Sequence, residues 1–382
     1  MTGSAFERQQ LTASQKLLQI RWLFVVLVCL AGGIGGVMLY SAANGDLNPW
    51  ATRHLVRFGV GLGLMIAVAV SDIRLWFRYA YVFYFVCLAL LGAVEIAGSV
   101  GMGAQRWINL GFMNLQPSEL MKIALVLALA RYFHGVTIEE IGRPAVLLVP
   151  LLMVAAPSGL VLRQPDLGTA LMLVIAAGAM FFVAGVRLWK FALVFVCGVG
   201  VLPVIWQSLH DYQRQRVLTF LNPERDPLGA GYHIIQSKIA LGAGGVFGKG
   251  FLQGSQSHLN FLPEKQTDFV FTMLAEEFGL VGALGLLGVY TLMLLYGFAI
   301  AASSRSYFGR LVAVGVSMTF FLYMFINMAM VMGLIPVVGV PLPLLSYGGT
   351  AMVTLMLGFG FMMSVYVHRD VVLGRRSSGE IL

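Results

Sequence analysis

The sequence predicts an all-α integral membrane protein, a bundle of ten transmembrane helices with one long, partly helical loop on the exported side. Of the 382 residues, 59% are hydrophobic and only 11% are charged, whereas a soluble domain has about 25% charged residues. Ten apolar runs approach the length of about 20 residues that a helix needs to cross a bilayer. Because no run alternates apolar and polar residues, a helical bundle is favoured over a membrane barrel.

The ten runs lie between charged or turn-rich breaks. They cover residues 20–41, 55–71, 75–98, 118–134, 144–161, 168–186, 189–207, 269–299, 310–333 and 345–367. The weakest are 144–161 and 189–207, which are bounded by proline and tryptophan instead of clear charge. The chain then divides into an N-terminal tail (1–19), seven spanning helices (20–207), a long exported loop (208–268), three more spanning helices (269–367) and a C-terminal tail (368–382).

The long loop runs from about His210 to Asp268, while the other connections are short. Loops of this length are usually functional or disordered. This one has a helix-compatible stretch from Tyr232 to Leu241 and further aromatic residues at Tyr212, Phe220, Phe247, Phe251 and Phe261. These side chains favour an ordered loop that packs on the membrane helices.

The distribution of cations indicates the orientation, because lysine and arginine hold short cytoplasmic loops in place. With both ends cytoplasmic, 14 of the 25 basic residues fall in inside segments and span ends, and four (Arg53, Arg57, Arg106 and Arg163) fall outside. The long loop is left out of this count, since long loops translocate largely regardless of charge. The net charge of +8 is therefore interpreted as membrane topology. It does not indicate a nucleic-acid partner, because no basic strip is interleaved with aromatic residues for base stacking.

The three cysteines, Cys29, Cys87 and Cys197, each stand inside an apolar run. They are far apart and have no metal-ligand spacing, so we interpret them as small buried apolar residues. The exported loops contain no cysteine, and we expect no disulfide to hold them.

Ionisable residues inside spans are costly and are usually functional or paired. Glu119 stands three residues before Lys122, just after Pro117-Ser118. Pro117 and Ser118 suit a helix start, and the spacing places both charges on one helical face, where they can neutralise each other. One interpretation is a structural ion pair that locks the bundle. The other is a charged wall of a hydrophilic cavity.

A second cluster, Arg163 to Gly168, follows the fifth run. Pro165 ends a helix there and Asp166 can cap the next one, while Arg163 adds a cation at the exterior surface. Asp166 is thus either a helix cap or a site residue.

Glycines crowd the stretch from Gly242 to Gly254, which also contains Lys249. A phosphate-binding P-loop does not fit, because Ala243 stands where its first glycine is required and Gly250 replaces the Ser or Thr after the lysine. A backbone nest that binds a diphosphate remains an alternative.

Asp268 stands at the start of the eighth run, and Glu276 and Glu277 follow about two turns further in. An acidic residue at a helix N-terminus is favoured by the helix dipole, which is one explanation of Asp268. A general base for a lipid-linked substrate also needs a carboxylate at this boundary. The two glutamates are harder to explain as solvated charges. At this point, transporter and enzyme are equally well supported.

The uncharged stretch with Pro336, Pro341 and Pro343, followed by Ser346-Tyr347-Gly348-Gly349, precedes the last run. It is either a rigid re-entrant segment that borders a cavity or a tight connection.

Together and in this order, these clusters resemble the SEDS family (shape, elongation, division and sporulation) of bacterial membrane proteins over nearly the whole chain. The matching stretches are Gly103 to Ile108, Gln116 to Lys122, Gln164 to Gly168, the glycine-rich loop, Thr267 to Phe269, Glu276 to Gly279, Gly339 to Pro343 and Ser346 to Gly349. The short N-terminal tail, the Gly339–Pro343 turn and the ending Met363–Arg369 resemble the elongation members more than the division members. Thr350 departs from the family, which usually has Ser there, but both residues carry a hydroxyl.

The resemblance implies a peptidoglycan glycosyltransferase of the bacterial cytoplasmic membrane that polymerises lipid II, an undecaprenyl-diphosphate-linked disaccharide peptide, on the outer face. It implies a class B penicillin-binding protein and other elongation-complex proteins as partners, with membrane lipids around the bundle. The family's essential loop aspartate corresponds to Asp268, its exported-side tryptophan to Trp107, and its intramembrane acid–base pair to Glu119 and Lys122.

On this basis we expect Asp268 to be the catalytic base, and Trp107, Arg106, Glu119, Lys122, Arg163, Asp166, Arg214 and Lys249 to line the substrate cavity. The charge of the leaving diphosphate must be stabilised electrostatically. The exterior cations are Arg53, Arg57, Arg106, Arg163, Arg214, Arg216, Lys238 and Lys249, of which we favour Arg106 and Arg214. A divalent cation, Mg²⁺ or Mn²⁺, could share this task, although no ligand cluster in the sequence demands one.

Three alternatives stay open. A flippase for the lipid-linked precursor also needs a charged cavity within a bundle. A division-specific member of the same family would have the same chemistry. A scaffold that only recruits partners would not need Asp268.

Overall fold

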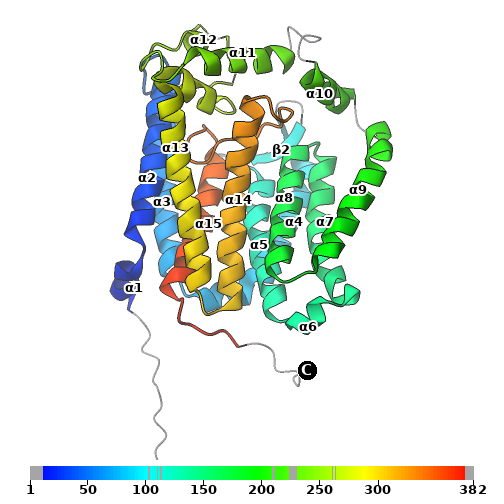
Figure 1. Ribbon diagram of the computed structural model, residues 1–382. Coiled ribbons are helices and arrows are strands. Elements are labelled where there is room, and N and C mark those ends of the chain that lie inside the picture. The colour runs from blue at the N-terminus through cyan, green and yellow to red at the C-terminus, as the bar shows by residue number, and fades with distance from the viewer. Residues whose placement is uncertain are drawn as a thin grey trace, which may run out of the picture.

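Long helices form the body of the protein in the computed structural model, which describes residues 12–101, 104–109, 111, 114–208, 211–222, 230–259, 261–262 and 264–374. The long helices lie side by side along one direction (Figure 1). They are α2 (Trp22–Ala42), α3 (Ala51–Val70), α4 (Ile73–Ala97), α5 (Pro117–His134), α7 (Pro144–Arg163), α8 (Leu167–Val183), α9 (Leu188–Ser208), α13 (Val270–Ser303), α14 (Tyr307–Val331) and α15 (Gly349–Val367).

Each apolar run predicted from the sequence holds one of these helices, so the helical membrane-protein class is confirmed. Within the described part of the chain, seven helices (α2, α3, α4, α7, α13, α14 and α15) are long and apolar enough to cross a membrane. Three further long helices are not among these seven. The helix α8 and the Leu188–Val201 part of α9 are apolar but shorter, and α5 carries three charged residues, Glu119, Lys122 and Arg131. The number of ten crossings stays a prediction.

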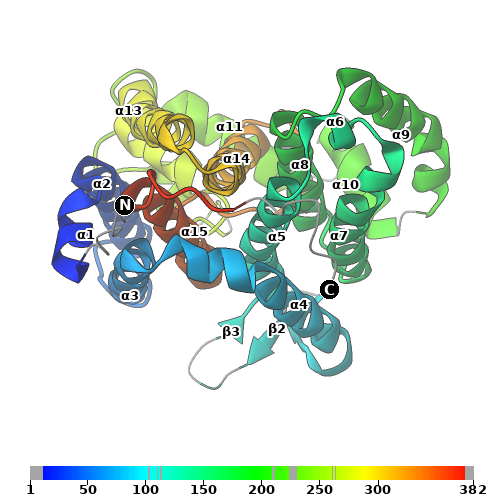
Figure 2. The same ribbon diagram turned by 90° about the horizontal axis from the view of Figure 1, so that it is seen from below.

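The helices α14 and α15 are largely buried inside the protein, each over 83% of its most apolar stretch, and α5 is equally buried apart from Leu120, Arg131 and Tyr132. Seen from below, α15 lies between α3 and α14, and α9 lies at the outer edge of the bundle in both views (Figure 2). The outward faces of α3, α4 and α9 expose large apolar side chains such as Val60, Phe85 and Phe195. A bilayer suits such faces because its hydrocarbon is as apolar as they are.

The all-α prediction was wrong in one respect, because the structure contains a few short strands. A small antiparallel sheet, β1 (Ser99–Gly101), β2 (Ala104–Asn109) and β3 (Asn114–Leu115), connects α4 to α5. Ser99 pairs with Trp107 and Ile108 with Leu115. The strands have two to six residues, which is too short for an alternating pattern to show, and strand pairing sets their conformation. Gly103 lies outside the described residues.

The long loop forms α10 (Asp211–Leu221), α11 (Ala230–Ala243) and α12 (Ser255–His258). They lie at the end of the bundle opposite α1 (Ala13–Gln19) and the segment after α15 (Figure 1). The helix expected at Tyr232–Leu241 is confirmed as part of α11, whereas α10 was not predicted. The side chain of Ser237 on α11 is buried, donates to Val331 O at 2.7 Å and lies 2.8 Å from Thr272 Oγ1. This part of the loop therefore packs on α13 and α14. His210 and residues 223–229 lie outside the described residues.

The two predicted tails and the three cysteines were the remaining expectations for the fold. Residues 1–11 and 375–382 of the predicted tails lie outside the described residues, but Ala13–Gln19 of the N-terminal tail is the helix α1, with Thr12 as its cap. Of the cysteines, Cys87 is buried as expected, whereas Cys29 and Cys197 are exposed. The prediction of burial was wrong for these two because an apolar run does not show which face of a membrane helix points outward. The short helix α6 (Ile138–Ile141) completes the helices of the described chain.

Candidate functional site

Asp268 lies two residues before α13 begins and is partly buried. The backbone of its segment is held by the end of α14 and by the turn that precedes α15. Tyr347 N donates to Gln266 O at 2.8 Å, and the Ser346 hydroxyl donates to Thr267 O. Asn327 Nδ2 donates to Asp268 O at 2.9 Å. Three successive carbonyl groups are thus fixed from one side.

The carboxylate of Asp268 adjoins the outer turn, which is the uncharged segment 336–348 that precedes α15. Gly339 has a positive φ of 72°, a conformation that favours glycine. A Cβ at this position would lie 3.5 Å from Asp268 Oδ2. The preceding residue, Val338, contacts the start of α8, because a Cβ at Gly168 would lie 3.3 Å from its Cβ. The outer turn therefore connects Asp268 with the neighbourhood of Asp166.

The glycine-rich segment crosses α13 where that helix is broken at Gly279, whose φ and ψ are 66° and −161°. Leu280 N and Val281 N donate to Gly245 O and Val246 O. In return, Lys249 N and Gly250 N donate to Glu276 O and Glu277 O, each at 3.0 Å. These contacts satisfy the backbone groups that a broken helix leaves without intrahelical partners.

This arrangement gives the glycines a structural explanation. A Cβ at Gly244 would lie 2.0 Å from Ala275 O, and one at Gly248 would lie 2.1 Å from Glu277 O. The amides that a diphosphate nest would need are already occupied, since Gly248 N donates to Gly244 O at 2.8 Å and those of Lys249 and Gly250 donate to α13. The diphosphate nest considered from the sequence is not formed by these amides.

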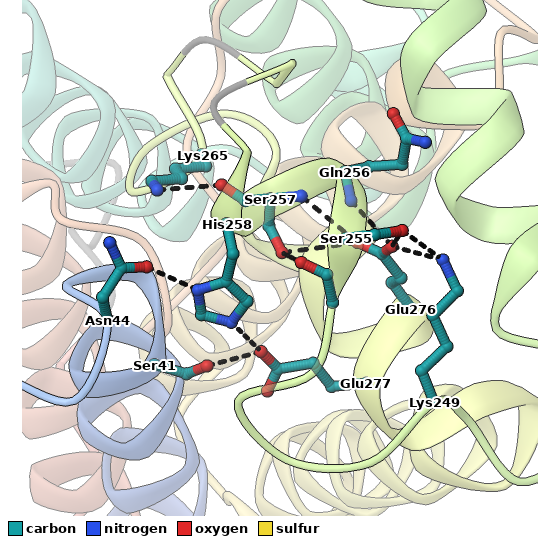
Figure 3. A network of polar contacts seen from close by, with 11 residues as sticks. Ser41, Asn44, Lys249, Ser255, Gln256, Ser257, His258, Lys265, Glu276 and Glu277 are labelled. Carbon is teal, nitrogen blue, oxygen red and sulfur yellow. Dashed lines mark hydrogen bonds and ion pairs between the residues drawn. The ribbon is translucent and has the colours of Figure 1, made fainter.

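Glu276 fastens the loop to α13. Its carboxylate is 0% exposed and accepts from Lys249 Nζ at 2.9 Å and from Gln256 N at 2.9 Å. Ser255 Oγ, Ser257 N and Ser257 Oγ each lie 3.3 Å from one of its oxygens (Figure 3). The expectation that this glutamate is not a solvated charge is confirmed, because one ammonium and several neutral donors satisfy it.

Glu277 makes the neighbouring contact, to the C-terminal end of α2. Ser41 Oγ donates to Glu277 Oε1, and His258 Nε2 lies 3.2 Å from the same oxygen (Figure 3). The other ring nitrogen of His258 contacts Asn44 Oδ1. Lys265 Nζ, in turn, donates to Ser257 O at 2.9 Å, and burial lowers the pKa of this lysine. The two glutamates therefore hold the segment before Asp268 against α13 and α2.

Glu119 and Lys122 form an ion pair with a third member. Lys122 Nζ lies 2.8 Å from Glu119 Oε1, and each residue is only 4% exposed. The Tyr323 hydroxyl, on α14, donates to Glu119 and accepts from Lys122. The helix begins at Pro117, as predicted. The pair is closed off from solvent, which supports a structural lock more than an open charged wall.

Arg106 and Asp166 are also brought together. Asp166 caps α8 by accepting from Thr169 N at 3.1 Å and from Thr169 Oγ1 at 3.0 Å. Arg106 Nη1 lies 3.7 Å from Asp166 Oδ2, and the same guanidinium donates to Gln164 O and Pro165 O. Asp166 is thus both a helix cap and the partner of a cation. Trp107 follows Arg106 in β2 and is partly buried.

Other sequence candidates lie away from this cluster. Arg163 is exposed at the end of α7. The guanidinium of Arg214 donates to Trp206 O and Gln207 O, where it caps the end of α9. Lys249 belongs to the Glu276 cluster. The role of each in substrate binding stays a prediction.

The sequence reasoning missed Tyr323 and Asn327. They stand four residues apart on α14 and so share one helix face, with Tyr323 at the Glu119–Lys122 pair and Asn327 at Asp268. A tyrosine and an asparagine at this spacing inside an apolar run were a visible signal, because buried polar groups need partners. Within the described part of the chain, no group of three or more His, Cys, Asp or Glu side chains could hold a metal ion. The described residues therefore form no ready ligand set for the divalent cation considered from the sequence.

Comparisons with known proteins point to one family. A model of the FtsW/RodA/SpoVE family of cell cycle proteins matches residues 21–371. The peptidoglycan glycosyltransferase MrdB of Escherichia coli K12 is 44% identical over 350 residues, which cover 91% of this chain and 94% of that protein. The probable peptidoglycan glycosyltransferase FtsW of Trichlorobacter lovleyi is 36% identical over 365 residues, which cover 92% and 94%.

Two solved structures are similar over 92% of the chain. One is a chain from a structure described as "Structural coordination of polymerization and crosslinking by a peptidoglycan synthase complex", with a TM-score of 0.79, 34% identity and 98% of that chain covered. The other is the rod shape determining protein RodA of Thermus thermophilus, with a TM-score of 0.69, 30% identity and 97% of that chain covered.

Proposed function

Because the chain belongs to the FtsW/RodA/SpoVE family of cell cycle proteins, we propose that it is a peptidoglycan glycosyltransferase that polymerises lipid II with Asp268 as its general base. Relatives with this activity in their names match more than 90% of the chain. The observation that carries the residue assignment is the placement of Asp268. It is a partly buried carboxylate at the start of a spanning helix, with a backbone fixed by three hydrogen bonds.

The reaction needs one base. The Asp268 carboxylate takes the proton from the 4-hydroxyl of the acceptor sugar as that oxygen attacks the anomeric carbon of the donor. The bond from the anomeric carbon to the diphosphate oxygen breaks, and its electron pair leaves with the polyprenyl diphosphate. Since the diphosphate leaves without being protonated, the second carboxylate that glycoside hydrolysis requires is not needed. The configuration at the anomeric carbon is inverted.

The developing charge on the diphosphate needs a cation that is already in place. Of the two arginines favoured from the sequence, Arg106 adjoins the site through Asp166, Gly168 and the outer turn. Arg214 caps the end of α9, which lies at the edge of the bundle (Figure 2). We place Arg106 first. Its guanidinium would exchange a backbone carbonyl for a phosphate oxygen, which is a stronger, charge-assisted partner.

The expected setting is the outer face of the bacterial cytoplasmic membrane, with both termini in the cytoplasm and a class B penicillin-binding protein as partner. The described end segments lie opposite α11 and α12 (Figure 1). This agrees with an orientation in which both termini are cytoplasmic and the long loop is exported. The similarity to a chain of a peptidoglycan synthase complex supports a partner. The higher identity to MrdB than to FtsW supports a role in elongation over division.

A lipid II flippase is the alternative from another class, because a polar cluster within a bundle suits either task. Purified full-length protein in detergent, given lipid II alone, decides between the two. Glycan chains longer than the starting disaccharide are the expected product, and translocation of the headgroup across vesicles without any polymer would support the flippase. A scaffold would make neither product and would tolerate loss of Asp268.

A further inference from the structure

Asn327 is a fully buried polar residue, 0% exposed, on the last turns of the central helix α14. Its side-chain nitrogen donates to Asp268 O at 2.9 Å and to Val340 O at 2.8 Å. Both partners are carbonyl oxygens, which only accept, so the orientation of the amide is unambiguous. One side chain therefore joins the segment that carries Asp268 to the segment that lies beside its carboxylate.

The side-chain oxygen of Asn327 takes no part in these contacts. Asn327 Oδ1 is buried and has no hydrogen-bond partner among the described residues. An unpaired buried oxygen lowers stability, so stability alone does not explain an asparagine at this position. Asn327 contributes the two N–H donors of its amide, and both bind backbone carbonyls beside the Asp268 carboxylate.

The geometry points to Asn327 as a positioning residue for Asp268, an inference that rests on the proposed role of Asp268 as general base. Asn327 fixes the backbone of Asp268 relative to Val340, and Gly339 beside Val340 is the residue that adjoins the carboxylate. Ser346 supports the same segment by donating to Thr267 O while it accepts from Leu342 N at 2.7 Å. The carboxylate is thereby held in one place before substrate arrives.

This role predicts a specific kinetic defect. Misplacing a reacting group by about 1 Å can lower a rate by about a hundredfold, even when the change lies outside the reacting atoms. A residue that only positions the base acts on the chemical step and does not contribute to substrate binding. Its loss should lower kcat and leave KM unchanged. A residue that merely stabilises the fold would lower the amount of active protein and its melting temperature together.

The test compares Asn327→Leu with Thr319→Val in purified full-length protein. Leucine keeps the branching and the number of side-chain heavy atoms of asparagine, is somewhat larger, and removes both donors. Thr319 lies on the same helix, is 2% exposed and donates only to Gly315 O within α14, so its variant loses a buried hydrogen bond far from Asp268. We expect Asn327→Leu to lower kcat for lipid II polymerisation by about a hundredfold with KM within about twofold of wild type, and Thr319→Val to match wild type.

Equal kcat values for Asn327→Leu and Thr319→Val would overturn the inference, as would a defect confined to KM. Should Asn327→Leu not fold, Ser346→Ala decides in its place, because it removes the adjacent support at Thr267 O. A lowered kcat with normal melting supports the inference, and a wild-type kcat overturns it. Asp268→Asn is measured in parallel. If it polymerises normally, the proposed base is wrong, whereas if it is inactive and Asn327→Leu is normal, only the positioning role is wrong.

Discussion

Lys249 Nζ lies 2.9 Å from Glu276 Oε1 across the junction between the glycine-rich loop and α13. The carboxylate is completely buried, while the lysine side chain is 29% exposed. The ion pair therefore fixes a loop to a helix, eight residues beyond the proposed base. It accounts for two charged residues that could otherwise be interpreted as substrate ligands.

Glu276→Gln should lower the stability of the protein and loosen the loop. The glutamine amide would present N–H donors to Lys249, Gln256 N and Ser257 N, which are donors themselves, so at least one buried group would lose its partner. Such a loss costs about 1–3 kcal/mol. The melting temperature in detergent should fall, and the amides of Gln256 and Ser257 should exchange faster with solvent. Glu139→Gln, at an exposed position on α6, is the control. Equal melting temperatures of the two variants would show that Glu276 does not hold the loop on α13.

Gly248→Ala should be far more harmful than Gly245→Ala, although both glycines have positive φ, 82° and 54°. Alanine in the left-handed region costs about 1–2 kcal/mol, which applies to both. Only at Gly248 would the new Cβ also lie 2.1 Å from Glu277 O, whereas none lies within 4 Å at Gly245. We expect Gly245→Ala to fold with a slightly lower melting temperature and Gly248→Ala to give little folded protein. Equal yields and melting temperatures would show that the loop does not cross α13 this closely.

Glu119→Gln and Lys122→Met should each destabilise the protein by about 3–5 kcal/mol, because either change leaves a buried charge without its partner. The exchanged pair, Glu119→Lys with Lys122→Glu, should recover much of this loss, since Tyr323 can donate to a carboxylate or accept from an ammonium. The free energy of unfolding in detergent is measured for all three variants. Asp370→Asn, which breaks an ion pair between side chains 72% and 71% exposed, should leave stability unchanged.

The exchanged pair also separates the two interpretations of Glu119 and Lys122. A stable and active double variant supports the structural lock. A double variant with normal melting and no polymerisation would instead assign the pair a direct role at the site.

The sequence predicted the positions of the long helices and the burial of the two glutamates, since apolar runs and charges inside them are local features. The partners of those charges are not local. Ser41 and Glu277 are separated by 236 positions, and Asn44 and His258 by 214. No spacing rule could join them, because helix packing alone brings α2 against α13.

The glycine-rich segment shows the same limit. Its composition indicated a close approach, but the choice between a bound phosphate and another backbone needed the location of the break at Gly279. The sheet at 99–115 was missed because strand pairing, which sets its conformation, leaves no pattern in strands of two to six residues. Asn327 is recognisable as a polar residue inside an apolar run, but its partners are backbone carbonyls, which the sequence does not distinguish.

Asp268 is the proposed base for glycosyl transfer. The most direct test is the initial rate of lipid II polymerisation by purified wild type, Asp268→Asn and Asp46→Asn. Asparagine has the size of aspartate and cannot take the proton, while Asp46 is an exposed aspartate in the α2–α3 connection that lies outside the proposed site. This role of Asp268 predicts no polymer from Asp268→Asn, with normal melting and retained lipid II binding, and a wild-type rate from Asp46→Asn. A full yield of glycan chains from Asp268→Asn would contradict it.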